Sequence, residues 1–189
     1  AGQLALAQKL VAPDVRRAPR FGWSVAISND TIVVGGENAS RDFDRQGAVY
    51  IYELVDGEWV FQQDVTHANP ERADRLGTSV DVRGDLLVAG AISDRTPAGL
   101  GAAYLFKRGA DGSWTQAAEL IPDFFANDVG SDVVLLENQA IVGGQNSVHA
   151  FDLGCLVCTP DLDADGRLTL FDFLAFFNAF DAGDLAADL

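Results

Sequence analysis

A segment of sixteen residues that recurs three times constrains the fold of this chain more than any other feature. The copies read FGWSVAISNDTIVVGG from Phe21, LGTSVDVRGDLLVAGA from Leu76 and VGSDVVLLENQAIVGG from Val129. Aligned positions are 55 and 53 residues apart. Repetition at a fixed period of this size indicates a stacked or radial array of one supersecondary unit.

The unit predicted from the first copy has four strands. Short β-branched and aromatic runs alternate with tight turns at residues 28–30 and 55–57 and with a polar loop at residues 37–46, which is the pattern of an antiparallel sheet. The expected strands are Ser24–Ile27, Thr31–Val34, Ala48–Leu54 and Glu58–Thr66. The second copy repeats this order with Leu86–Ala89, Gly101–Lys107 and Ser113–Leu120. Four strands per unit of this length are typical of one blade of a β-propeller.

The two ends of the array are irregular. Residues 1–11 align with the fourth strand of a blade, so that Gln8 falls on Gln63, whereas the third copy runs to Leu153 without a fourth strand. Two complete blades and one incomplete blade are too few for a closed ring of about 4–8 blades. We therefore expect an open arc. The chain has no Met and no visible signal peptide, and we interpret it as a segment of a longer protein with further blades upstream.

Two recurring residue types have expected structural roles. Trp59 and Trp114 hold the same position in successive repeats, and we predict that both fill the core between blades. The paired glycines near the strand ends are expected to permit close approach of neighbouring backbones.

The charge and hydropathy of the chain exclude some function classes. The formal net charge is −15, whereas binding to a phosphate backbone needs clustered Lys and Arg, so we expect no nucleic-acid partner. No apolar run reaches the ~18 residues of a membrane span, so none is predicted.

The motif FG-x-SV-x-I, the following D-x-IVVGG, the third run GAVYIY and an aromatic-bearing fourth run together resemble FG-GAP repeats. These repeats build integrin-α-like propellers and propellers of many secreted bacterial proteins. The resemblance covers residues 1–153 and implies a mainly β fold, an open arc of four-stranded antiparallel blades at residues 21–66, 76–121 and 129–153.

Some blades of the integrin pattern bind calcium in a D-x-D/N-x-D-G loop between the second and third strands, and this chain departs from that pattern. Its first such loop offers only Asp42 and Asp44, and its second offers only Asp94. Calcium takes six to eight oxygen ligands with concentrated carboxylates, so we predict no calcium site in the blades.

The strongest chemical signal lies after a short linker at residues 154–160. The segment DLDADGRLTLFD places oxygen ligands at loop positions 1, 3, 5, 7, 9 and 12, with Gly166 at the sharp turn of position 6, as calcium coordination in an EF-hand loop requires. Position 7 would contribute its backbone carbonyl. The predicted Ca²⁺ ligands are Asp161, Asp163, Asp165, Arg167, Thr169 and Asp172.

Asp at loop position 12 and a following apolar helix over Phe171–Phe180 resemble a dockerin, and FDFLAFFNAF resembles dockerin-like tags on secreted proteins of planctomycete-type bacteria. Residues 161–189 correspond to half of such a module. The resemblance implies a cohesin-like protein partner or a role in sorting.

Other candidate chemistry is weaker. Cys155 and Cys158 form a lone C-x-x-C, which fits a local disulfide or free or differently paired thiols. His67 and His149 have no reproducible partners across the repeats, and no nucleophile–base pair or phosphate loop is apparent.

We therefore expect a non-enzymatic binding or adhesion scaffold, secreted or displayed at the cell surface. Its propeller loops would contact a protein partner or an extracellular carbohydrate, and its calcium module would dock or sort it. The alternatives are an accessory region of a larger secreted carbohydrate-active or other hydrolytic enzyme, and a purely structural repeat protein.

Overall fold

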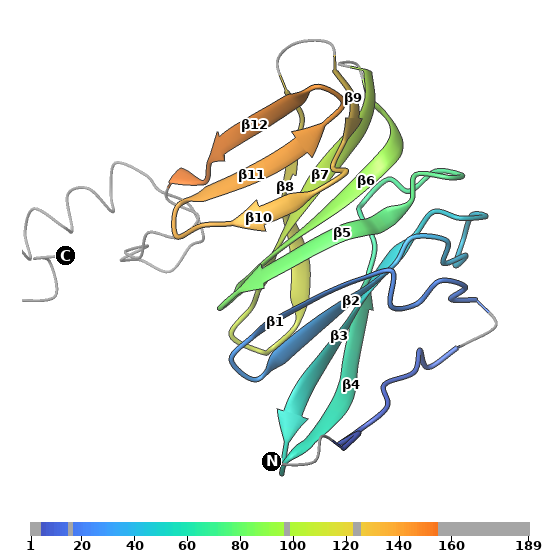
Figure 1. Cartoon of the computed structure of the whole chain (residues 1–189), viewed down its shortest axis with the longest axis vertical. Helices are drawn as coiled ribbons and strands as arrows, with labels where there is room; N and C mark the ends of the chain where they lie inside the picture. The colour runs from blue at the N-terminus through green and yellow to red at the C-terminus, as the bar shows by residue number, and fades with distance from the viewer. Residues whose placement is uncertain (1–4, 15–16, 97–98, 123–125, 155–189) are drawn as a thin grey trace, which may run out of the picture. The chain divides into compact units, whose positions relative to one another are not determined.

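The computed structural model describes residues 5–14, 17–96, 99–122 and 126–154, and these ranges form β-strands, turns and loops (Figure 1). The strands are β1 (Ser24–Ser28), β2 (Thr31–Gly36), β3 (Ala48–Val55), β4 (Glu58–Val65), β5 (Leu76–Arg83), β6 (Leu86–Thr96), β7 (Gly99–Arg108), β8 (Trp114–Leu120), β9 (Ala126–Val129), β10 (Val133–Leu135), β11 (Gln139–Gly144) and β12 (Ser147–Asp152). Within the described part of the chain, no helix has the length and apolarity needed to cross a membrane.

Three antiparallel sheets follow the three sequence copies. The first has the order β1-β2-β3-β4, the second β5-β6-β7-β8 with β9 paired to β7 in parallel outside this order, and the third β10-β11-β12. The prediction of a mainly β fold with four antiparallel strands per complete unit is confirmed. In the second sheet, β6 continues to Thr96, well beyond the predicted end at Ala89, and its pairing with β7 shifts register between Ala91 and Arg95.

The hairpin between β3 and β4 turns where Asp-Gly predicts it. Asp56 and Gly57 have φ angles of 52° and 86°, the left-handed conformation that both central residues of a type I′ turn need. The corresponding β7–β8 hairpin is one residue longer, with Arg108 opposite Trp114 where the first sheet has Leu54 opposite Trp59.

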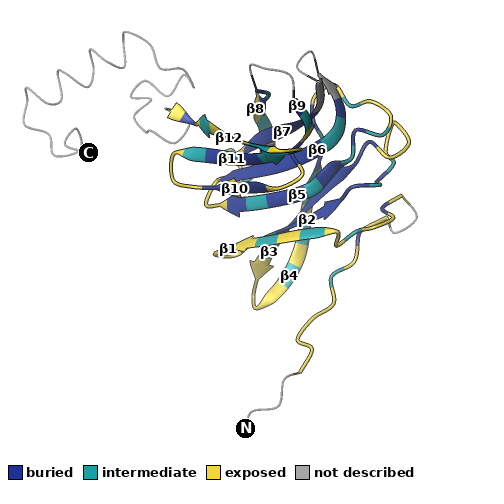
Figure 2. Ribbon diagram, turned by 45° about the horizontal axis from the view of Figure 1, so that its top comes forward, coloured by how far each residue is buried: buried dark blue, intermediate teal, exposed yellow. Residues whose placement is uncertain are grey.

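The main core lies between the first and second sheets, and burial is concentrated in β2, β3, β6 and β7 (Figure 2). Side chains from one face of the first sheet, including Val33, Val49 and Ile51, pack in one cluster with Val80, Val82 and Trp114 of the second. Trp114 therefore occupies the predicted core position. Trp59 is only half-buried and packs on a separate, smaller cluster that includes Tyr50 and Tyr52.

The sheets interlock through glycine and serine at equivalent positions. A Cβ atom added to Gly35 would lie 2.1 Å from the carbonyl oxygen of Gly77, and one added to Gly90 would lie 1.9 Å from that of Gly130. The close backbone approach predicted for the paired glycines is confirmed at these two contacts. The Ser24 hydroxyl donates to the Gly77 carbonyl at 2.9 Å, and the Ser79 hydroxyl donates to the Gly130 carbonyl at 2.8 Å.

Parallel pairing adds a second link between neighbouring sheets, which the sequence analysis did not predict. Gly47 bridges Leu76 in parallel, and β9 pairs with β7 in parallel at the equivalent residues Gly101 and Val129. Backbone pairing thus joins the first sheet to the second and β7 of the second sheet to the strand before the third.

The segment 5–12 has no strand assignment, yet it takes the place that β4 takes one repeat later. The Gln8 side chain donates to the Trp59 carbonyl and accepts from the Trp59 amide, both at 2.9 Å. Gln63 makes the same two hydrogen bonds to Trp114, at 3.0 and 2.9 Å. The predicted calcium ligands from Asp161 to Asp172, the expected helix after them and both cysteines lie outside the described residues.

Candidate functional site

A polar cavity of about 170 Å³ lies at the junction of the first two sheets. The connection from β4 to β5 forms one wall, and side chains of β6, β7 and β8 form the rest. Its lining residues are His67, Ala68, Asn69, Glu71, Asp94, Tyr104, Gln116 and Glu119.

Tyr104 is the central side chain of this cavity. Its hydroxyl donates to the Asp94 carboxylate, and the same oxygen lies 3.1 Å from Oε1 of Glu119. A phenol has one proton, so it can satisfy only one of the two carboxylates at a time. Burial, reinforced by Asp94 and then Glu119, raises the pKa of Tyr104 well above its usual range, so the phenol stays neutral at physiological pH.

His67 stacks on the Tyr104 ring and is held in place by Asp74. The two rings are stacked, with centroids 4.4 Å apart and an interplanar angle of 18°. Nε2 of His67 lies 3.1 Å from Oδ2 of Asp74, which also accepts a hydrogen bond from the Glu71 backbone amide. Burial raises the pKa of the Asp74 carboxyl; the Glu71 amide and His67 oppose this effect, and Asp94 reinforces it.

The cavity is suited to binding a cation or a strong hydrogen-bond donor. Glu71, Asp94 and Glu119 bring three carboxylates to its lining, and none of the described lining residues is Lys or Arg. Asp94 is buried and accepts a hydrogen bond from Tyr104, whereas Glu71 and Glu119 are exposed, so an ammonium or guanidinium group at the mouth of the cavity could pair with their carboxylates.

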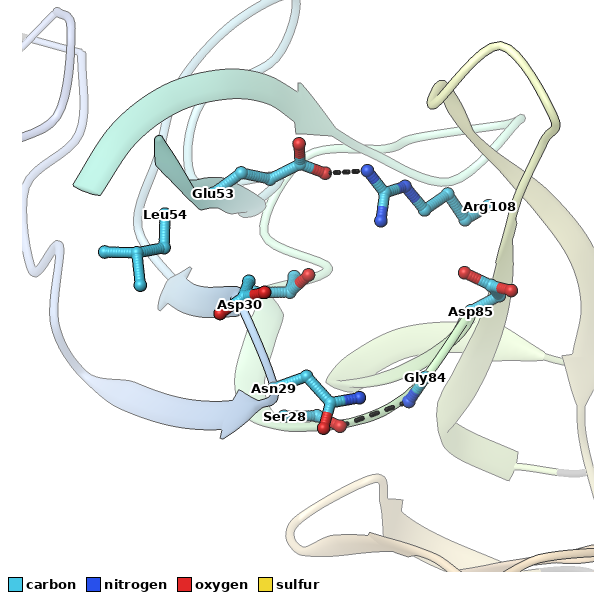
Figure 3. Close-up of a pocket in the computed structure, with 9 residues that line it drawn as sticks. Ser28, Asn29, Asp30, Glu53, Leu54, Gly84, Asp85 and Arg108 are labelled. Carbon is cyan, nitrogen blue, oxygen red and sulfur yellow. Dashed lines mark hydrogen bonds and ion pairs between the residues drawn. The ribbon is translucent and has the colours of Figure 1, made fainter. Parts of the chain in front are cut away.

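A second hollow of about 330 Å³ lies between the hairpin turns of the first two sheets (Figure 3). Glu53 forms an ion pair with Arg108 across it, and the Gly84 amide donates to the Ser28 hydroxyl at 3.2 Å. The Arg108 amide also donates to the Asp85 carbonyl at 2.8 Å. The contacts Glu53–Arg108 and Gly84–Ser28 thus join the first sheet to the second at this hollow.

The blade-loop acids have other partners than calcium. Asp44 pairs with Arg45 and Arg72, and Asp94 belongs to the polar cavity. Across the ranges that the structure describes, no group of three or more His, Cys, Asp or Glu could hold a metal ion. The predicted ligands Asp161, Asp163, Asp165, Arg167, Thr169 and Asp172 fall outside those ranges.

The cavity could not be recognised from the repeat pattern, because its polar residues do not recur. His67 and Asp94 align with Ala12 and Ala39, which are buried in the preceding unit, while Tyr104 aligns with Tyr50. The alignment of the repeats does contain a signal. Two positions change together from alanine to polar residues, while the tyrosine between them is retained. A second polar pair that was not predicted lies on β12, where Oγ of Ser147 is 2.9 Å from Nε2 of His149. Neither residue lines the cavity.

A comparison with protein families finds two tandem matches to the FG-GAP repeat, over residues 5–52 and 59–106. Each match begins at a fourth-strand position and ends in the third strand of the next sheet, so the family repeat is offset from the sheet by one strand. A comparison with curated proteins returns no match.

Proposed function

Because this chain belongs to the FG-GAP repeat family, whose repeats are non-catalytic, propeller-type and found in extracellular and surface proteins, we propose that it is a secreted or surface-displayed binding scaffold. Residues 1–153 form its open arc of blades, residues 154–160 a linker and residues 161–189 a calcium module. The observation that supports binding most directly is the acidic cavity at the first blade junction.

The favoured ligand of the cavity is a lysine or arginine side chain of a protein partner. Glu119 shares the single Tyr104 proton with Asp94, so an ammonium or guanidinium group would supply the missing donors. The overall charge of −15 would also steer a basic partner toward the chain. Carbohydrate is less favoured at this site, because the His67 and Tyr104 rings are buried and leave no exposed platform for a sugar.

Calorimetric titration with an acetylated Gly-Arg-Gly-Arg-Gly amide peptide tests this recognition. Glu119→Gln should weaken binding about threefold to tenfold, since it removes one charge-assisted partner. Glu58→Gln is the matched control, because it removes the same charge from an exposed position on β4 outside the cavity. Equal losses in the two variants would show that only net charge matters, and the cavity would not be the site.

The calcium module is proposed on the chemistry of its donor set. Asp161, Asp163, Asp165 and Asp172 supply carboxylates, Arg167 a backbone carbonyl and Thr169 a direct or water-mediated contact, at the spacing of an EF-hand loop. Without metal these carboxylates repel one another, so ordering of the loop would be coupled to calcium. The module would dock the scaffold to a cohesin-like protein or serve as a sorting tag.

Calcium titration of the full chain by calorimetry tests the module independently of the cavity. The wild type should release heat with about one site, and an Asp161→Ala/Asp165→Ala variant should release none. Asp42→Ala/Asp44→Ala is the matched control, because it removes two acids from a blade loop that is not expected to bind calcium. Heat that persists in the Asp161→Ala/Asp165→Ala variant would rule out the EF-hand assignment.

A further inference from the structure

The first sheet contains a counterpart of the polar cavity in which the chain itself supplies a cation. Tyr50 lies opposite Asp64 in the register of β3 with β4. Tyr104 lies opposite Glu119 in the same way on β7 and β8. Residues directly opposite each other in an antiparallel pair lie on the same face of the sheet. Asp64 therefore has the place in the first sheet that Glu119 has at the cavity of the second.

In the first unit, the carboxylate of Asp64 has a guanidinium partner. Nη1 of Arg41, in the loop between β2 and β3, lies 2.8 Å from Oδ2 of Asp64. Burial raises the pKa of Tyr50 to about 12, and Asp64 reinforces this rise whereas Arg41 opposes it, so the guanidinium lies within electrostatic range of the phenol. The first unit thus brings a tyrosine, a carboxylate and an arginine together.

The second unit retains the tyrosine and the carboxylate but has no arginine at the aligned position. Arg41 aligns with Thr96, and β6 continues to Thr96 where the first unit has its loop. Glu119 forms no ion pair with any residue that the structure describes. It lies 3.1 Å from the Tyr104 hydroxyl, whose single proton is donated to Asp94. The carboxylate of Glu119 is therefore available to a cation from outside the chain.

Building on the proposed recognition of a basic side chain, we infer that the cavity selects arginine over lysine, and that a partner's guanidinium takes at Glu119 the place that Arg41 takes at Asp64. A guanidinium is planar, presents five N–H donors in a fixed fork that matches a carboxylate, and is more weakly hydrated than an ammonium. After pairing with Glu119 it still has N–H groups for other acceptors of the lining, among them Glu71. A lysine ammonium is a strongly hydrated point charge and loses more hydration for the same contact.

Calorimetric titration of the full chain with two peptides of equal charge tests this preference. The acetylated Gly-Arg-Gly-Arg-Gly amide should bind about threefold to tenfold more tightly than the acetylated Gly-Lys-Gly-Lys-Gly amide. In Glu119→Gln the two peptides should bind equally, because the carboxylate that distinguishes them has been removed. Glu58→Gln is the matched control and should keep the preference, since Glu58 is exposed on β4 outside the cavity.

The possible outcomes separate the arginine preference from the function on which it rests. If neither peptide binds, the recognition of a basic side chain fails and the preference fails with it. If the two peptides bind equally and both weaken in Glu119→Gln, the cavity binds cations but the arginine preference is wrong. A preference that persists in Glu119→Gln would have its origin outside the cavity and would also overturn the inference.

A further variant tests whether the chain fills the site itself. Arg95 adjoins Thr96 in the sequence, and Arg95→Ala removes that guanidinium. The arginine peptide should bind this variant as it binds the wild type. A gain in affinity of about threefold or more would show that Arg95 competes for the site, because an occupied site lowers the apparent affinity. In that case the guanidinium at Glu119 would come from the chain and not from a partner.

Discussion

The interlocking glycines allow a quantitative test of the junction, because the three repeats place the same residue in three surroundings. Alanine at Gly90 would bring its Cβ to 1.9 Å from the Gly130 carbonyl oxygen, and alanine at Gly35 to 2.1 Å from that of Gly77. Both obstacles are backbone atoms, so no side-chain rotation can relieve them. Alanine at Gly143 would have its nearest neighbour at 3.4 Å, an ordinary contact.

The two substitutions are expected to change the free energy of unfolding in different ways. Gly90→Ala must separate two packed sheets by about 1 Å and so combines an overpacking cost of about 1–3 kcal/mol with loss of about 1 kcal/mol from the Ser79 hydrogen bond. We expect a loss of about 3 kcal/mol in the free energy of unfolding, or a fall in Tm of about 6–12 °C for a unit of this size. Gly143→Ala should be neutral or stabilise by up to about 1 kcal/mol, because alanine restricts the unfolded chain.

Thermal and urea unfolding of dilute protein, followed by circular dichroism, measures these differences. Gly35→Ala should resemble Gly90→Ala, and Gly143→Ala should resemble the wild type. If Gly143→Ala destabilises as much as Gly90→Ala, the glycines are required for local strand geometry, and our explanation through contact between sheets is wrong.

Three further predictions concern single side chains. Trp114→Ala should cost about 3–5 kcal/mol of stability in urea unfolding and Trp59→Ala about 1–2 kcal/mol, because only Trp114 is fully buried; equal losses would contradict this difference. Burial raises the pKa of all three tyrosines, that of Tyr50 to about 12. Since these folded values exceed the unfolded one, their stabilisation is complete below pH 10 and is lost as the pH rises toward 12; a phenolate step at 295 nm near pH 10 in the folded protein would refute this. Gln46→Ala should speed proteolysis within residues 39–47, because the buried amide oxygen accepts hydrogen bonds from the amides of two loop residues at 2.9 and 2.6 Å; an unchanged cleavage rate would show that the loop is held elsewhere.

Repetition made the sheets predictable from sequence. Asp56-Gly57 and the β-branched runs around it carry local signals, and each signal was reinforced by its copy one repeat later. The end of β6 was not predictable in this way, because its extension past Ala91 has no counterpart in the first copy, where β2 ends at the equivalent Gly36. The half-burial of Trp59 was missed for a different reason, since burial depends on what lies beside a repeat and not on the repeat itself.

The cavity was harder to predict because its residues are far apart in sequence and unlike their equivalents. His67 and Asp94 have no local pattern, and their meaning depends on the Tyr104 ring between them. Gln46 looks like an ordinary polar loop residue, yet it is fully buried and organises the loop before β3. Such roles depend on tertiary contacts, whereas the predicted calcium loop rests on spacing within twelve residues and stays a prediction.

The second sheet is the only one of the three described sheets with a neighbour on each side, through Gly77 toward the first and Gly90 toward the third. In an array whose units touch only adjacent units, cooperativity decays with distance and the outer members fray first. Amide hydrogen exchange should therefore be slowest in β6 and β7 and faster in β1 and β10. Because each repeat contacts only its neighbours, a whole repeat can be gained by duplication or lost by deletion without changes to the residues of the remaining junctions.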